Sequence, residues 1–129
     1  MKDGENQQTA ILLPIKPDNR NQGRGGSFWR TAKDREAFEW QLRASGYTRP
    51  TCGSRVDLTL TRVLGKGDRL WDADSVLRGN AKELIDSLVA LGWFHDDGPK
   101  WIRHCDGRQD KTRRDVGPCW EIEISEVDE

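Results

Sequence analysis

The segment 69–102 constrains this chain most, because it places one amphipathic helical pattern between two pairs of aspartates. From Ser75 to Leu91, apolar residues recur at helical spacing, at positions 77, 81, 84, 88 and 91. This pattern predicts a helix over 75–91 that Asp74 or Ser75 caps and that Gly92 ends. A helix of about 17 residues is about 25 Å long, so it separates the two carboxylate pairs.

The first pair, Asp72 and Asp74, follows an apolar stretch that is typical of a strand end. Side chains two residues apart on a strand leave the same face, about 6 to 7 Å apart, so one divalent cation could sit between them. The second pair, Asp96 and Asp97, follows the helix. Asp97 reaches the first pair only if the chain runs back along the helix or if the pairs come from different subunits. D-x-D is a common pattern, and isolated aspartates are usually surface residues.

The other apolar patterns predict the remaining elements of one small domain. They indicate strands over 9–15, 55–64, 100–105 and 119–127, and a further helix from a capping box at Thr31 to about Ala44. The order β-α-β-α-β-β predicts an α+β fold, with helices packed on a mixed sheet. We expect 106–118 to be a long hairpin tip or a disordered loop. Residues 1–8 are expected to be a disordered tail, and 9–129 the folded domain.

Positive charge is concentrated in two stretches, although the net charge is −1. These stretches are 16–35 and 100–114, whereas the chain from Glu121 onward is acidic. A flexible glycine-containing loop at 19–27 could follow a phosphate backbone. The alternative is that the basic stretches are solvated loops. The candidate DNA-binding residues are Lys16, Arg20, Arg24, Arg69, Arg78, Lys100 and Arg103.

Several short motifs in this order are similar to those of the RusA-type Holliday junction resolvases. That family has D-x-D-N, then a lysine, D-A-L, a glycine and a D-D pair. Here the corresponding residues are Asp72-Ala73-Asp74-Ser75, Lys82, Asp86-Ser87-Leu88, Gly92 and Asp96-Asp97, followed by Gly98-Pro99-Lys100-Trp101. The early run Leu13-Pro14-Ile15-Lys16-Pro17-Asp18-Asn19 resembles the family's loop after its first strand. The chain departs from the family at Ser75, where asparagine is usual. Arg78 is a rival of Lys82 because the helix is one turn longer before the lysine.

The resemblance implies an intimately homodimeric, magnesium-dependent endodeoxyribonuclease that cuts four-way DNA junctions in recombination and repair. It implies that Asp72, Asp74 and Asp97 bind Mg²⁺, with Mn²⁺ as a substitute, and that Lys82 acts with them in catalysis. Asp96 is expected to cap the turn or to orient a metal-bound water, although sequence alone does not separate it from Asp97. Two alternatives remain: a branched-DNA-binding module of the same fold that cuts poorly, and a protein-interaction domain with a tryptophan-rich surface.

Composition limits the class of protein and its location. The 129 residues suffice for one domain, and the six tryptophans favour a dimer interface as well as a core. No apolar run is long enough for a membrane span, and the first eight residues do not resemble a signal peptide, so we expect a cytoplasmic protein. The three cysteines lack C-x-x-C spacing, which favours reduced structural thiols. Nothing indicates a small-molecule cofactor.

Overall fold

The computed structural model describes residues 8–17, 27–44, 55–72, 75–77, 80–93 and 98–127; the side chains of 8, 9 and 27–32 are not described. Its elements are β1 (Gln8–Leu13), α1 (Ser27–Ala44), β2 (Val56–Val63), α2 (Ala81–Ala90), β3 (Ile102–Asp110) and β4 (Cys119–Glu126). This order confirms the predicted α+β fold. Neither described helix has the length and hydrophobicity needed to cross a bilayer.

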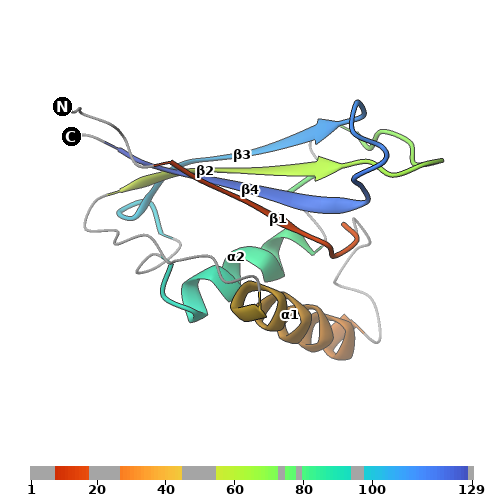
Figure 1. Cartoon of the computed structure of the whole chain (residues 1–129). Helices are drawn as coiled ribbons and strands as arrows, with labels where there is room; N and C mark the ends of the chain where they lie inside the picture. The colour runs from red at the N-terminus through yellow and green to blue at the C-terminus, as the bar shows by residue number, and fades with distance from the viewer. Residues whose placement is uncertain are drawn as a thin grey trace.

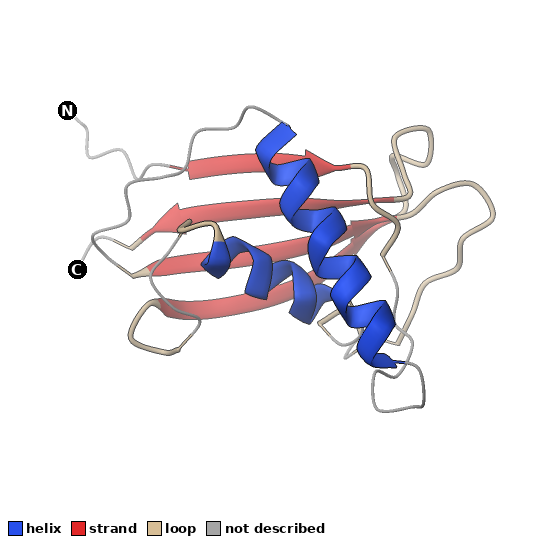
Figure 2. Ribbon diagram, turned by 90° about the horizontal axis from the view of Figure 1, so that it is seen from below, coloured by secondary structure: helices blue, strands red, loops and turns tan. Residues whose placement is uncertain are grey.

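The four strands form one mixed sheet in the order β1-β4-β2-β3. β4 pairs antiparallel with both β1 and β2, whereas β2 and β3 are parallel. Parallel neighbours need a crossover, and α2 supplies it between β2 and β3. Both helices lie against the same face of the sheet (Figures 1 and 2). The chain therefore enters α2 at the end of the sheet where β2 ends, and leaves it toward the end where β3 begins.

The core lies between the sheet and the two helices. Val56, Leu58 and Leu60 are buried at alternating positions of β2, as a strand with one face on the core requires. Ile122 and Ile124 of the neighbouring strand β4 lie beside them, paired with Leu60 and Leu58. The helices add Phe38, Leu42, Ala81, Leu84 and Leu88 to this core. Arg62 is the next residue of β2 on the same face as Val56, Leu58 and Leu60. A charged side chain therefore lies at the end of the core face.

The helix predicted over 75–91 begins six residues late, at Ala81. The Ser75 amide instead donates to the Asp72 carbonyl at 2.9 Å, which forms a turn. Neither Asp74 nor Ser75 is the cap: Asn80 holds that position, and its side chain does not bond to the helix. The C-terminal prediction is correct, because Gly92 has a φ of 80°.

Segment 75–77 packs against the middle of β3. A Cβ added to Gly107 would lie 2.9 Å from Val76 Cβ, so glycine allows this close approach. The packing holds the segment in turns ahead of the helix, which is a tertiary effect that helical periodicity does not reveal.

A hairpin tip or disordered loop was predicted for 106–118, and this is wrong for residues 106–110. β3 extends to Asp110, and β2 lies between β3 and β4, so these two strands are not a hairpin. The polar sequence of β3 fits an edge strand, whose exposed charges discourage pairing with other chains. Other element boundaries also differ from the predicted ones. Gln8 belongs to β1 rather than to the tail, β1 ends at Leu13, and α1 begins at Ser27, before the predicted capping box.

Candidate functional site

Asp72 is exposed on the loop that follows β2, and the side chain of Gln109 fixes the residue before it. The Trp71 amide donates to Gln109 Oε1 at 2.9 Å, and Gln109 Nε2 donates to the Trp71 carbonyl at 3.1 Å. The Gln109 side chain therefore bonds both backbone groups of Trp71, as a neighbouring strand would. Asp72 is not part of a strand, contrary to the expected geometry of the D-x-D pair.

Arg62 of β2 supports the same loop. It was not among the site residues predicted from the sequence. Its guanidinium carbon lies 3.8 Å from the centre of the Trp71 ring. Arg62 Nη1 donates to the Arg69 carbonyl and to Gln109 Oε1, both at 2.8 Å. The side chain is only 5% exposed, and burial lowers the pKa of its guanidinium while Asp68 opposes the shift. The sequence signal was a charged residue at an inward position of an alternating strand.

A second arginine holds the start of the loop. Arg114 Nη1 donates to the carbonyls of Gly65 and Asp68 at 2.7 and 2.8 Å. Asp68 Oδ2 accepts from the Gly65 amide at 2.7 Å, and Gly67 has the positive φ that this turn requires. The loop before Asp72 is thus held by β2, β3 and the β3–β4 connection. This support holds the backbone up to Trp71, the residue directly before Asp72.

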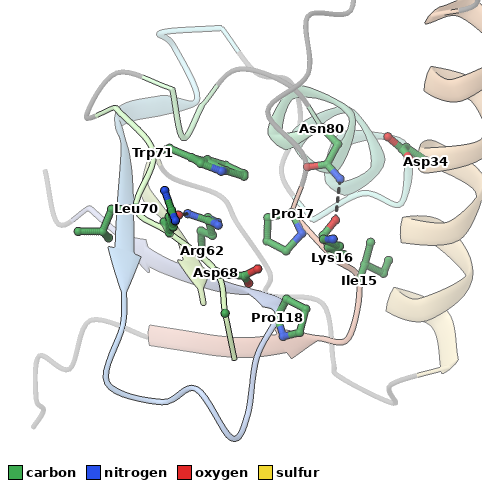
Figure 3. Close-up of a pocket in the computed structure, with 12 residues that line it drawn as sticks. Ile15, Lys16, Pro17, Asp34, Arg62, Asp68, Leu70, Trp71, Asn80 and Pro118 are labelled. Carbon is green, nitrogen blue, oxygen red and sulfur yellow. Dashed lines mark hydrogen bonds between the residues drawn. The ribbon is translucent and has the colours of Figure 1, made fainter. Parts of the chain in front are cut away.

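A pocket of about 760 Å³ opens beside Trp71, on the helix side of the sheet. Two predicted DNA-binding residues from distant parts of the chain, Lys16 and Arg69, both line it. Figure 3 shows Lys16 beside Pro17 and Asn80 at this pocket. Asn80 ties the Lys16 segment to the start of α2, because Asn80 Nδ2 donates to the Lys16 carbonyl at 3.1 Å. The full lining is Ile15, Lys16, Pro17, Asp34, Arg62, Gly67, Asp68, Arg69, Leu70, Trp71, Asn80 and Pro118.

Lys82 lies in the first turn of α2, two residues after the pocket-lining Asn80. Its side chain is exposed. The neighbouring Glu83 points inward instead and is only 3% exposed. Glu83 Oε1 has no hydrogen-bond partner among the described residues. Burial raises the pKa of Glu83, and the carboxylates of Asp34 and Asp86 add to the shift.

Glu83 was not among the site residues predicted from the sequence. Glu83 and Ser87 are four residues apart beside the apolar stripe of α2, and Ser87 Oγ is 3.4 Å from the Arg35 carbonyl of α1. These two polar residues therefore belong to the side of α2 that meets α1. A carboxylate bordering an apolar stripe was the available signal.

Lys100 and Arg103 lie toward the other end of the sheet. Arg103 makes two hydrogen bonds to Asp57, at 2.7 and 3.1 Å, and they lower the pKa of that carboxyl. Lys100 Nζ is 5.5 Å from the centre of the Trp101 ring. Ile102 and Gln109 are separated by about 23 Å of extended strand, at about 3.3 Å per residue. Lys100 and Arg103 therefore lie far from the pocket that contains Lys16 and Arg69.

The remaining predicted site residues lie outside the described part of the chain: Asp74, Asp96, Asp97, Arg20, Arg24 and Arg78. Within the described ranges, no group of three or more His, Cys, Asp or Glu side chains could hold a metal ion. The three proposed metal ligands thus remain a prediction, because only Asp72 is described. Gly98, the first described residue after Asp97, precedes the start of β3.

No family model matches this sequence, and no curated protein matches it.

Proposed function

We propose that this chain is a metal-dependent endodeoxyribonuclease of the crossover-junction type, which hydrolyses phosphodiesters in four-way DNA. The observation that carries the proposal is the setting of Asp72. This exposed carboxylate begins the resolvase-like motif, follows a loop that is held at several points, and comes directly after Trp71, which lines a pocket together with Lys16 and Arg69. Phosphate cleavage needs such a combination, since a carboxylate binds the metal and nearby cations bind the charged backbone.

The donor chemistry of the motif fits Mg²⁺, which prefers carboxylate oxygens and retained waters. Asp72, Asp74 and Asp97 would hold the ion, which would neutralise phosphate charge and lower the pKa of a bound water. Lys82 provides a positive charge for the scissile phosphate or the leaving oxygen. Lys16 and Arg69 position the strand through its phosphates. Arg62 and Gln109 keep the backbone before Asp72 in place.

The active form that we propose is a homodimer that works on DNA in the cytoplasm, in recombination or repair. A four-way junction has approximate two-fold symmetry, and a dimer with two-fold symmetry presents two equivalent sites to it. Each subunit would then cut one of two opposing strands.

The proposal is tested with single carboxylate-to-amide variants on a synthetic four-way junction in Mg²⁺. Asp72→Asn, Asp74→Asn and Asp97→Asn should each abolish cleavage, because each removes a metal ligand. Junction binding should persist or tighten, since negative charge near the phosphates is also removed. Asp106→Asn is the matched control, because Asp106 is an exposed carboxylate of β3 outside the proposed site. Near wild-type cleavage by any of the three variants would remove that residue from the ligand set.

Two other functions predict different results in the same assay. A branched-DNA-binding module, which Ser75 in place of the usual asparagine favours, would bind the junction in Mg²⁺ without cutting it. A tryptophan-rich interaction domain would not bind the junction at all. Trp40 is 66% exposed, as that third function requires, but Trp93 and Trp120 are buried at 2% and 0% exposure.

A further inference from the structure

The pocket beside Trp71 is larger than a phosphate contact requires. Its volume of about 760 Å³ lies within the range of about 300–1,000 Å³ that is usual for small-molecule sites. Its walls come from the segment after β1, Asp34 of α1, the end of β2, the loop before Asp72, the start of α2 and Pro118 (Figure 3). Several hydrogen bonds join these walls, so the pocket is a formed feature of the fold.

One wall carries a largely buried cation. Arg62 is 5% exposed, and its hydrogen bonds to the Arg69 carbonyl and to Gln109 both come from Nη1. In the described part of the chain, Arg62 Nε and Nη2 are not among the buried atoms that lack a partner, so Arg62 adds positive charge to the wall rather than unsatisfied donors. Exposed Lys16 and Arg69 add positive charge at the same pocket.

The other lining groups favour a ligand that is not only an anion. Trp71, Pro17 and Pro118 supply flat or apolar surface suited to an aromatic ring. Asp34 and Asp68 also line the pocket, and they would repel an isolated phosphate. A nucleotide fits both the apolar surface and the two carboxylates. Its base can lie on the apolar surface, and the hydrogen-bond donors of its base and sugar can face the carboxylates while its phosphate lies elsewhere.

We propose that this pocket binds a single nucleotide, with its base against Trp71 and the two prolines and its phosphate at Lys16 and Arg69. Arg62 adds its positive charge to the pocket wall beside Trp71. Binding itself does not require the chain to cut DNA. The further step, that the nucleotide belongs to the strand cut at the neighbouring Asp72, rests on the proposed function.

The test is a titration of the ¹⁵N-labelled full chain with dAMP in EDTA, read from the indole N–H signals of the tryptophans. Trp71 lines the pocket, and Trp120 Nε1 donates at 3.2 Å to the pocket-lining Asn80. Both signals should shift together, whereas the signal of Trp101, before β3, should not. Deoxyadenosine and deoxyribose 5-phosphate should each bind at least about tenfold more weakly than dAMP, because stacking and charge both contribute.

Matched cation variants locate the binding. Lys16→Ala and Arg69→Ala should each raise the Kd for dAMP at least about threefold, which is about half of the free-energy change of a tenfold effect. Lys66→Ala should not, because Lys66 is an exposed cation of the same loop that does not line the pocket. Equal binding of dAMP and deoxyribose 5-phosphate would reduce the pocket to an anion site and overturn the inference. Equal losses in Lys66→Ala and Arg69→Ala, or no shift of Trp71 and Trp120, would also overturn it.

The two proposals fail separately. Junction cleavage without dAMP binding would contradict the nucleotide pocket alone. Binding of dAMP by a chain that cuts no DNA would contradict the proposed nuclease alone.

Discussion

Lys82 is the residue whose role is most open to direct test, because Arg78 competes for it. A cation in the first turn of a helix opposes the helix dipole, which costs about 0.3–1 kcal/mol. Lys82→Ala should therefore leave thermal stability unchanged or slightly higher. Its single-turnover cleavage rate should nevertheless fall by about two to three orders of magnitude, the scale of losing one charge-stabilising donor.

Arg78→Ala is the comparison for Lys82→Ala. If Arg78 contacts phosphates away from the reacting atoms, its loss should weaken junction binding and the salt dependence of binding, with little change in the saturated rate. A larger rate loss in Arg78→Ala than in Lys82→Ala would assign the catalytic charge to Arg78.

Glu83 should make the stability of the fold depend on pH. Its pKa is raised in the folded state, so folding favours the protonated carboxyl. The resulting stability is fully present below the ordinary value of 4.5 and is lost as pH rises through the folded-state pKa. Glu83→Gln should thus stabilise the fold at pH 7, and this advantage should disappear below about pH 4.

Urea unfolding of both proteins at several pH values measures this effect. Glu36→Gln is the control, since Glu36 is an exposed carboxylate of α1 and the substitution is the same. A Glu83→Gln advantage that is the same at all pH values, or a loss of stability at pH 7, would contradict the account.

Among the elements, the loop before Asp72 receives two backbone hydrogen bonds from one side chain of β3, that of Gln109. Gln109→Ala removes both hydrogen bonds to the Trp71 backbone and the acceptor for Arg62. We expect the free energy of unfolding to fall by about 1–3 kcal/mol, because partly buried polar groups lose their partners. Arg108→Ala changes the exposed neighbouring residue and should cost less than about 0.5 kcal/mol. Equal losses in denaturant titrations would show that Gln109 does not hold the loop.

Element order was predictable from sequence, whereas element pairing was not. Alternation in β2 and β4 and helical spacing at Leu84 and Leu88 are local signals, and both appear in the structure. The insertion of β4 between β1 and β2 depends on contacts between distant residues. The late start of α2 has the same origin, since Gly107 admits Val76 and Leu77 against β3.

The candidate site was predictable only where the motif is local. Asp72 and Lys82 were predicted from the resemblance to the family motif, and Lys16 and Arg69 from their positive charge; the structure brings Lys16 and Arg69 to one pocket. Arg62 and Gln109 were missed, because their contacts with Trp71 join residues up to 38 positions apart. Their importance follows from tertiary contacts and not from any short pattern.

For the whole molecule, the proposed function requires two cooperating subunits. Trp40 is exposed on α1 and, with Ile15 and Ala37, lines a hollow of about 610 Å³. Tryptophan is enriched at protein interfaces. We expect light scattering at micromolar concentration to give twice the 14.8 kDa mass of one chain. A monomeric mass would contradict the dimer.

Cleavage of a synthetic four-way junction tests the proposed nuclease most directly. Each strand is labelled in turn, and the junction and a linear duplex of the same sequence are incubated with the protein in Mg²⁺ or EDTA. We predict paired cuts in two opposing strands near the branch point, in Mg²⁺ only, and little cutting of the linear duplex. Equal cutting of both substrates, or no cutting of the junction by folded protein in Mg²⁺, would contradict the proposal.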